Sequence, residues 1–273
     1  KGWCRAMETV PEFVDPSQEV IRVGDHFYVL ALSGRADDRT RVLKHGDTFA
    51  VMNRYGDMLA DRLGDQGLFH RGTRHLSRFD LLVGGLRPLI LSSGLDRDNL
   101  VLSVDLTNPD LSESGHINVA RGNVHLKRTC VLWDGVMHQR LTLHNYGLKA
   151  VALRLEARIS ADFADVFEVR GVPRKLPGCI FGARVEQGAI VAEYLGADQV
   201  RRWTRVRCEP EPARMSAGGA EFEIALEAGE EAALDIGVWC GEQATGTYDE
   251  VLSAARRRGA SMTAAACEVT TSR

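Results

Sequence analysis

Three carboxylates recur at every third residue between positions 160 and 171. Asp162, Asp165 and Glu168 would gather on one side of a short helical turn, and Arg170 follows them. Two carboxylates that flank a glycosidic bond can act as acid and base, or as acid and nucleophile. A solvent-facing helix or loop with Arg170 as counter-ion accounts for the same spacing and, on spacing alone, is the simpler interpretation. The four residues are therefore candidates for sugar binding, and their spacing does not establish a catalytic pair.

A second polar segment covers residues 65–78 and contains His70, Arg71 and Arg74 around Gly67 and Gly72. Arginine holds carboxylates and polyols through paired N–H donors, so this loop could contact a sugar. The alternative is a surface loop whose arginines offset the charges of Asp61 and Asp65. These three basic residues complete the set of candidate substrate-binding residues.

Common catalytic and nucleotide-binding motifs are missing from the sequence. There is no phosphate-binding loop, dinucleotide fingerprint, His-Glu-x-x-His pair, EF-hand loop or nucleophile elbow. The six cysteines include no Cys-x-x-Cys pair, and the eight histidines lack the spacing of a metal site. His138 and His144 would share a strand face but are too far apart to bind one metal. We expect no metal and no cofactor.

Composition excludes several classes of protein. The chain has 273 residues, 44% of them hydrophobic and 26% charged, with a formal net charge of −3. That balance argues against a strong nucleic-acid binder, which needs excess positive charge. No apolar run approaches the roughly 18 residues of a membrane span, and no secretory signal opens the chain. We expect a cytoplasmic protein with reduced cysteines and no membrane or nucleic-acid partner.

Most of the chain has the pattern of β-strands. Asp134 and Gly135 separate two strand-like runs and predict a tight hairpin. Residues 151–160 alternate apolar and polar side chains, as a half-buried strand does. We expect residues 123–160 to form a three-stranded meander that turns at residues 145–147, and a further hairpin at Gly84 and Gly85. The overall pattern is that of an all-β sandwich.

One helix is predicted near the C-terminus. Thr247 and Glu250 have the spacing of a capping box, and apolar residues follow at helical intervals. Residues 256–258 are three arginines that we place in the last turn, with Gly259 as the C-cap.

Five segments in fixed order carry a resemblance to a known family. They are LKHGDTF (43–49), GLFHRGTRHLS (67–77), VDLTNPD (104–110), WDG (133–135) and ADFADVFEVRG (161–171). Together they resemble the amino-terminal domain of bacterial-type glycogen debranching enzymes, the amylo-α-1,6-glucosidase family, over about residues 37–270. One position departs from that pattern: where the family usually has an acid between Arg71 and Thr73, this chain has Gly72, which puts sugar contact at this loop in doubt.

The resemblance implies a large antiparallel β-sandwich of the supersandwich, galactose-mutarotase-like type with a short C-terminal helix. Residues 1–36 would form a lead-in with the first strands, and residues 37–270 the sandwich domain. In the family the sandwich precedes a catalytic α/α barrel, which is absent from these 273 residues. The implied partners are an α-glucan and that C-terminal barrel.

We therefore expect a non-catalytic N-terminal module that shapes the glucan cleft and braces the barrel, with segment 162–171 facing it. A stand-alone carbohydrate-binding sandwich is the alternative. An epimerase of the mutarotase type, with His138 or His144 acting beside Glu156, has no support from the resemblance.

Overall fold

The computed structural model describes residues 20–23, 26–29, 40–59, 64–96, 98–113, 115–173, 178–241 and 246–265. It divides into two compact units, Lys1–Arg39 and Thr40–Arg273. In the first unit, β1 (Val20–Val23) and β2 (His26–Val29) pair as antiparallel strands. The rest of the predicted lead-in lies outside the described residues. The boundary after residue 36 stays a prediction.

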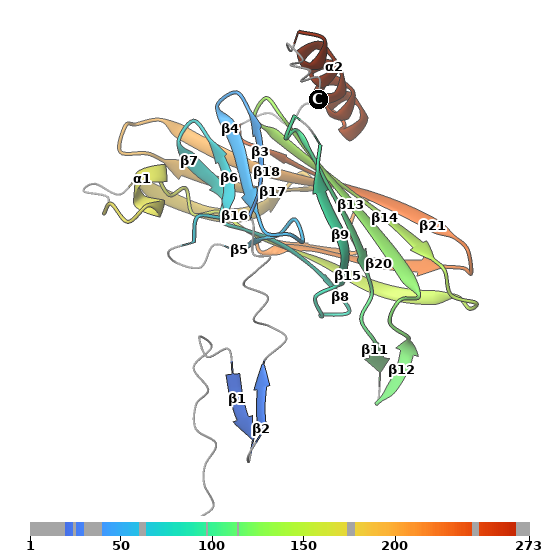
Figure 1. Cartoon of the computed structure of the whole chain (residues 1–273). Coiled ribbons are helices and arrows are strands. Elements are labelled where there is room, and N and C mark those ends of the chain that lie inside the picture. The colour runs from blue at the N-terminus through green and yellow to red at the C-terminus, as the bar shows by residue number, and fades with distance from the viewer. Residues whose placement is uncertain are drawn as a thin grey trace, which may run out of the picture. The chain divides into compact units, whose positions relative to one another are not determined.

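The second unit consists of antiparallel sheets (Figure 1). The large sheet has eight strands in the spatial order β16 (Cys179–Glu186), β17 (Ala189–Leu195), β18 (Arg201–Glu209), β21 (Glu231–Trp239), β14 (Val136–Asn145), β13 (Val124–Trp133), β10 (Val101–Thr107) and β9 (Leu89–Leu95). A five-stranded sheet has the order β19 (Arg214–Ser216), β20 (Gly219–Leu226), β15 (Val151–Ser160), β8 (Arg78–Val83) and β5 (Met58–Leu59).

The remaining elements are short. A four-stranded sheet has the order β3 (Arg41–His45), β4 (Thr48–Met52), β6 (Gly67–His70) and β7 (Thr73–Leu76). Strands β11 (Leu111–Glu113) and β12 (His116–Val119) form a separate pair. The helices are α1 (Val166–Val169) and α2 (Tyr248–Ala265).

One hydrophobic core lies between the large sheet and the two smaller sheets. Leu141 and Ile236 face it from the large sheet, Leu155 from the five-stranded sheet and Leu68 from the four-stranded sheet, all buried. The alternation in residues 151–160 is reproduced in β15, whose odd-numbered side chains are buried. The predicted all-β antiparallel sandwich with a C-terminal helix is confirmed.

The hairpin at Asp134 and Gly135 is also confirmed. Both residues have positive φ, 45° and 76°, and Trp133 pairs with Val136 across the turn. Two consecutive positive φ angles are what a type I′ turn requires, which is why Asp-Gly identifies it from sequence.

The predicted three-stranded meander over residues 123–160 is wrong. Strand β14 pairs with β13 and β21, whereas β15 pairs with β8 and β20 in the opposite layer. The turn after β14 is therefore a crossing between sheets. Buried Asn145 holds it, because its Nδ2 donates to the carbonyls of Lys149, Leu226 and Glu227 and its Oδ1 accepts from the Gly147 N–H. Two strands that each have one apolar face can bury these faces against each other only from different layers.

The second predicted hairpin turn, at Gly84 and Gly85, is present, with φ of 57° and 78°, but it does not join two strands of one sheet. The turn exists, and Val83 bridges Leu86 across it. The strands on either side then separate, since β8 joins the five-stranded sheet and β9 joins the large sheet.

Helix α2 begins as predicted and ends later than predicted. Glu250 Oε2 accepts from the Thr247 N–H at 2.8 Å, and Thr247 Oγ1 accepts from the Glu250 N–H at 3.4 Å, which completes the capping box. Tyr248, Val251 and Ala255 are buried and hold the helix against the large sheet. The helix continues to Ala265, so the arginines at 256–258 are not in its last turn and Gly259 is not its C-cap. Within the described residues, no helix is long and apolar enough to cross a membrane.

Candidate functional site

The two segments that carry the predicted site residues meet at one corner of the sandwich. Thr73 forms a bridge with Asp165, the Arg74 N–H donates to the Ala164 carbonyl at 2.8 Å, and the Val166 N–H donates to the Gly72 carbonyl at 2.9 Å. Residues 160–166 thus continue past β15 alongside β7. We call residues 67–77 and 160–172 the corner. Residues almost a hundred positions apart in sequence are placed next to one another there.

Arg74 and Asp162 form an ion pair within the corner. The Arg74 Nε lies 3.1 Å from Asp162 Oδ1, and its Nη2 lies 2.5 Å from Oδ2. The Arg74 Nη1 donates to the carbonyls of Gly64 and Gln66. The Arg74 side chain is 6% exposed and that of Asp162 is 36% exposed. Arg74 and Asp162, which were both predicted to bind sugar, therefore hold β7 against residues 160–166.

The other two predicted carboxylates cap α1. Asp165 is the N-cap and accepts from the Phe167 N–H at 2.8 Å, while Glu168 Oε2 accepts from the Asp165 N–H at 3.3 Å. This reciprocal arrangement is a capping box. Arg170 is the C-cap residue, and its side chain is exposed. The three-residue spacing of the carboxylates thus has a local structural cause, and a role in sugar binding stays a prediction.

The remaining predicted residues, His70 and Arg71, lie at the β6–β7 turn. The His70 Nδ1 lies 2.7 Å from Thr48 Oγ1, and partial burial and the nearby Arg71 lower the pKa of the His70 ring. Arg71 is exposed and has a φ of 48°. Gly72 has a φ of 79°, and a Cβ there would meet no atom within 4 Å. Glycine suits this backbone, and an acid at this position would extend from the turn into open space.

Two small pockets, each of about 240 Å³, border the corner. One is lined by Thr73, Phe163 and Asp165 together with residues 194–202 of the large sheet, and the other by His70, Arg71 and His75 with residues 200–203. Phe163 and Phe167, four residues apart in sequence, point in different directions. Phe163 is buried and stacks on Tyr194 at 5.3 Å, whereas Phe167 is 61% exposed.

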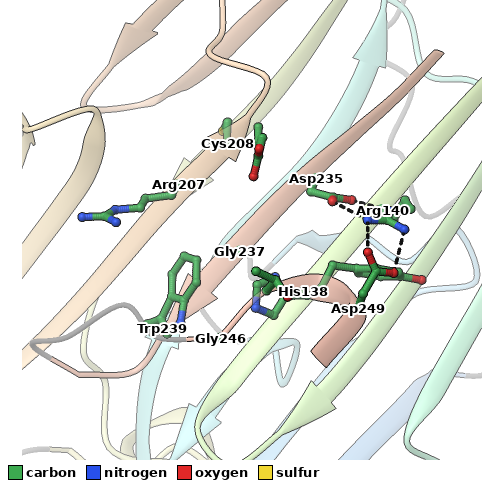
Figure 2. Close-up of a pocket in the computed structure, with 12 residues that line it drawn as sticks. His138, Arg140, Arg207, Cys208, Asp235, Gly237, Trp239, Gly246 and Asp249 are labelled. Atoms are coloured by element: carbon green, nitrogen blue, oxygen red, sulfur yellow. Dashed lines mark hydrogen bonds and ion pairs between the residues drawn. The ribbon is translucent and has the colours of Figure 1, made fainter. Parts of the chain in front are cut away.

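A larger pocket of about 520 Å³ lies on the outer face of the large sheet and was not predicted from the sequence (Figure 2). It is formed by β14, β18, β21 and the first turn of α2. Arg140 donates to both oxygens of Asp235, each at 2.7 Å, and to Asp249 at 3.0 and 3.2 Å. These carboxylates raise the pKa of Arg140 well above its usual range. The signal in the sequence was the polar face of β14, where His138, Arg140 and His144 alternate with buried residues.

The epimerase constellation is not formed. His138 and His144 project from the outer face of the large sheet, because the residues between them alternate into the core. Glu156 lies on the outer face of β15 in the opposite layer, where it pairs with Arg154 and Arg158. The core of the sandwich separates the imidazoles from this carboxylate.

Comparison with known proteins gives one family match. Residues 43–237 match the model of the N-terminal domain of some glycogen debranching enzymes. No curated protein matches the sequence.

Several solved structures have a similar fold at low sequence identity. A protein of Escherichia coli K12 assigned as an aldose 1-epimerase is 10% identical, with 74% of this chain and 98% of that chain covered and a TM-score of 0.44. A galactose mutarotase-like protein of Lactobacillus casei ATCC 334 is also 10% identical, with 74% and 99% covered and a TM-score of 0.41. A protein from the human microbiome assigned as a kojibiose phosphorylase is 10% identical at a TM-score of 0.42; 86% of this chain covers 33% of that one. We draw no functional conclusion from these similarities.

Proposed function

Since the chain belongs to the family of N-terminal domains of some glycogen debranching enzymes, we propose that it is the non-catalytic module of an α-1,6-glucosidase. In this proposal the corner shapes one wall of the glucan cleft and braces a separate catalytic α/α barrel. The catalytic acid and base would lie in that barrel. The partners would be an α-glucan and the barrel.

The observation that carries the proposal is the exposed apolar surface at the corner. Phe167 is 61% exposed and Val172 is 55% exposed, and the Val172 N–H donates to the Phe167 carbonyl, so the two lie at the same end of α1. Val200, which precedes β18 and is 49% exposed, lines the same pocket as Arg71, and its neighbour Arg201 lies over the ring of Phe181, which is 51% exposed. Large exposed apolar side chains with polar neighbours are typical of an interaction surface.

The rigidity of the corner supports the same role. Its carboxylates are engaged in a helix cap and in the Arg74 ion pair, so the exposed Phe167 and Arg170 project from a fixed framework. Glycoside hydrolysis requires two carboxyl groups available on either side of a bond. The engagement of Asp162, Asp165 and Glu168 favours a wall or an interface over catalysis.

The test uses a protein that joins this chain to its catalytic barrel. Phe167→Ala and Arg170→Ala are expected to weaken docking of the barrel, measured as a lower unfolding midpoint of the joined protein or a higher KM for branched dextrin. Arg214→Ala, an exposed arginine on β19, is the matched control. Unchanged stability and unchanged KM in both corner variants would contradict the proposal.

A further inference from the structure

The outer-face pocket is built from two rows of side chains across three neighbouring strands. The register of β14, β21 and β18 places residues opposite one another, and their neighbours Leu141, Ile236 and Val206 point into the core. The first row on the outer face is His138, Gly237 and Arg207, and the second is Arg140, Asp235 and Glu209. Neighbouring strands lie about 4.8 Å apart, so each row spans roughly 10 Å.

Gly237 leaves a gap at the centre of the first row, and the Trp239 ring occupies the space. A Cβ on Gly237 would lie 2.2 Å from the Trp239 ring and 2.9 Å from the His138 ring. Only glycine therefore allows the indole to lie over the strand beside the imidazole, with the two ring centroids 5.1 Å apart and the planes at 85°. Trp239, which is 7% exposed, and His138 thus line the pocket side by side (Figure 2).

His138 brings an unsatisfied polar atom to this pocket. The residue is 3% exposed, and its ring bonds the backbone of Gly246. Its Nε2 is buried and has no hydrogen-bond partner among the described residues. Burial lowers the pKa of the ring to about 4, so the imidazole is neutral at pH 7. Leaving such an atom unpaired destabilises the folded chain, and a ligand hydroxyl at Nε2 would remove that cost.

The charges of the pocket favour a neutral ligand. Asp235 and Asp249 together more than offset Arg140. Arg207 and Glu209 are exposed, of opposite sign and two residues apart on one face of β18. Phosphate or carboxylate ligands need an excess of positive charge, which this pocket lacks. An indole surface bordered by hydrogen-bonding groups of both kinds suits a ring with apolar C–H faces and a rim of hydroxyls.

We propose that this pocket binds one pyranose ring of a neutral sugar, with the sugar against the edge of Trp239 and its hydroxyls on His138 Nε2, Arg207 and Glu209. The first turn of α2 forms one wall, since Asp249 is tied to Arg140 across it. The proposal concerns a different face from the corner and does not depend on docking of a barrel.

The experiment is calorimetric titration of the purified chain with maltose and with isomaltose at pH 7. His138→Phe keeps an aromatic ring and removes the acceptor, and Arg207→Ala removes an exposed donor. Each should weaken sugar binding about tenfold, the equivalent of one lost hydrogen bond. Arg214→Ala, outside the pocket, should leave the affinity unchanged, and Arg170→Ala reports separately on sugar binding at the corner.

Each outcome of the titrations either supports or overturns the proposed sugar site. Loss of affinity in the pocket variants with normal circular dichroism supports the site. Absence of sugar binding by the wild-type chain overturns the proposal. Sugar binding that is abolished by Arg170→Ala and unaffected by the pocket variants also overturns it, because the sugar would then bind at the corner. Stronger binding of inorganic phosphate than of either sugar would also overturn it. If His138→Phe fails to fold, Arg207→Ala decides, because Arg207 is exposed and carries no core packing.

Discussion

Replacing Asp162 by Asn tests whether this carboxylate serves the fold. The substitution keeps the shape of the side chain and removes the charge that faces Arg74, whose guanidinium is 6% exposed. Breaking a fully buried ion pair costs about 3–5 kcal/mol, because the remaining charge has lost its partner. Asp162 is 36% exposed, so water replaces part of the interaction. Two backbone carbonyls also continue to accept from Arg74.

We therefore expect the free energy of unfolding to fall by about 2–3 kcal/mol, and the thermal midpoint to fall by about 5–10 °C. Urea denaturation of wild type, Asp162→Asn, Arg74→Gln and the double variant gives the coupling energy directly. The double variant should be destabilised by about 1–3 kcal/mol less than the sum of the two single variants, because the second substitution removes a charge that the first left unpaired.

Glu156→Gln is the matched control. Its partners Arg154 and Arg158 are 57% and 46% exposed, so this change should cost less than about 1 kcal/mol. A cost for Asp162→Asn as small as that of the control, or additive effects in the cycle, would refute the structural assignment. A stable variant with weakened affinity for maltose would instead support the role in sugar binding predicted from the sequence.

Three further predictions concern other parts of the fold. Thr247→Ala removes the capping box of α2 and should lower the free energy of unfolding by about 1 kcal/mol, measured by urea denaturation; an unchanged midpoint would show that α2 adds nothing to stability. Burial lowers the pKa of His75 to about 3. Below pH 6.5 the His75 ring is therefore protonated in the unfolded chain and stays neutral in the folded chain until the pH approaches 3. Stability should therefore fall with decreasing pH below 6.5 by up to about 1.4 kcal/mol per pH unit, and His75→Gln should reduce this slope; equal slopes would contradict the assignment. Cys179 is exposed, whereas burial raises the pKa of Cys130 to about 12; iodoacetamide should modify Cys179 faster than Cys130 in the folded chain, and equal rates by peptide mass spectrometry would contradict this.

Local signals in the sequence predicted the local structure well. The positive φ angles of Asp134 and Gly135 are required by the turn itself, and the capping box of Thr247 and Glu250 involves residues three apart. The alternation in β15 indicated which side chains are buried. Such features depend on neighbours in the chain, so a single sequence contains them.

Long-range pairing could not be predicted in this way. The turn at Asn145 has the same composition whether the next strand pairs with β14 or crosses to the other layer. A buried ion pair in the core is another example: Arg128 Nη1 lies 2.6 Å from Asp57 Oδ1, and both side chains are less than 5% exposed. Nothing near either residue in sequence indicates a partner 71 positions away.

In the candidate site, too, local features were predictable from the sequence and long-range contacts were not. Spacing identified Asp162, Asp165 and Glu168 as a group, and the structure explains the spacing by a helix cap and an ion pair with Arg74. The outer-face pocket could not be predicted from the sequence, because its residues come from three strands and a helix. Two of its residues carry a local signal in the sequence, His138 as a strand-face histidine without a metal partner and Thr247 as part of a capping box.

The central claim, that this chain is a non-catalytic module, is tested most directly by incubating the purified, folded chain with branched limit dextrin and measuring released glucose. We predict no release above the protein-free blank. Glucose release that follows the chain through purification, and that Asp165→Asn or Glu168→Gln abolishes without unfolding the protein, would contradict the claim and place the catalytic carboxylates at the corner.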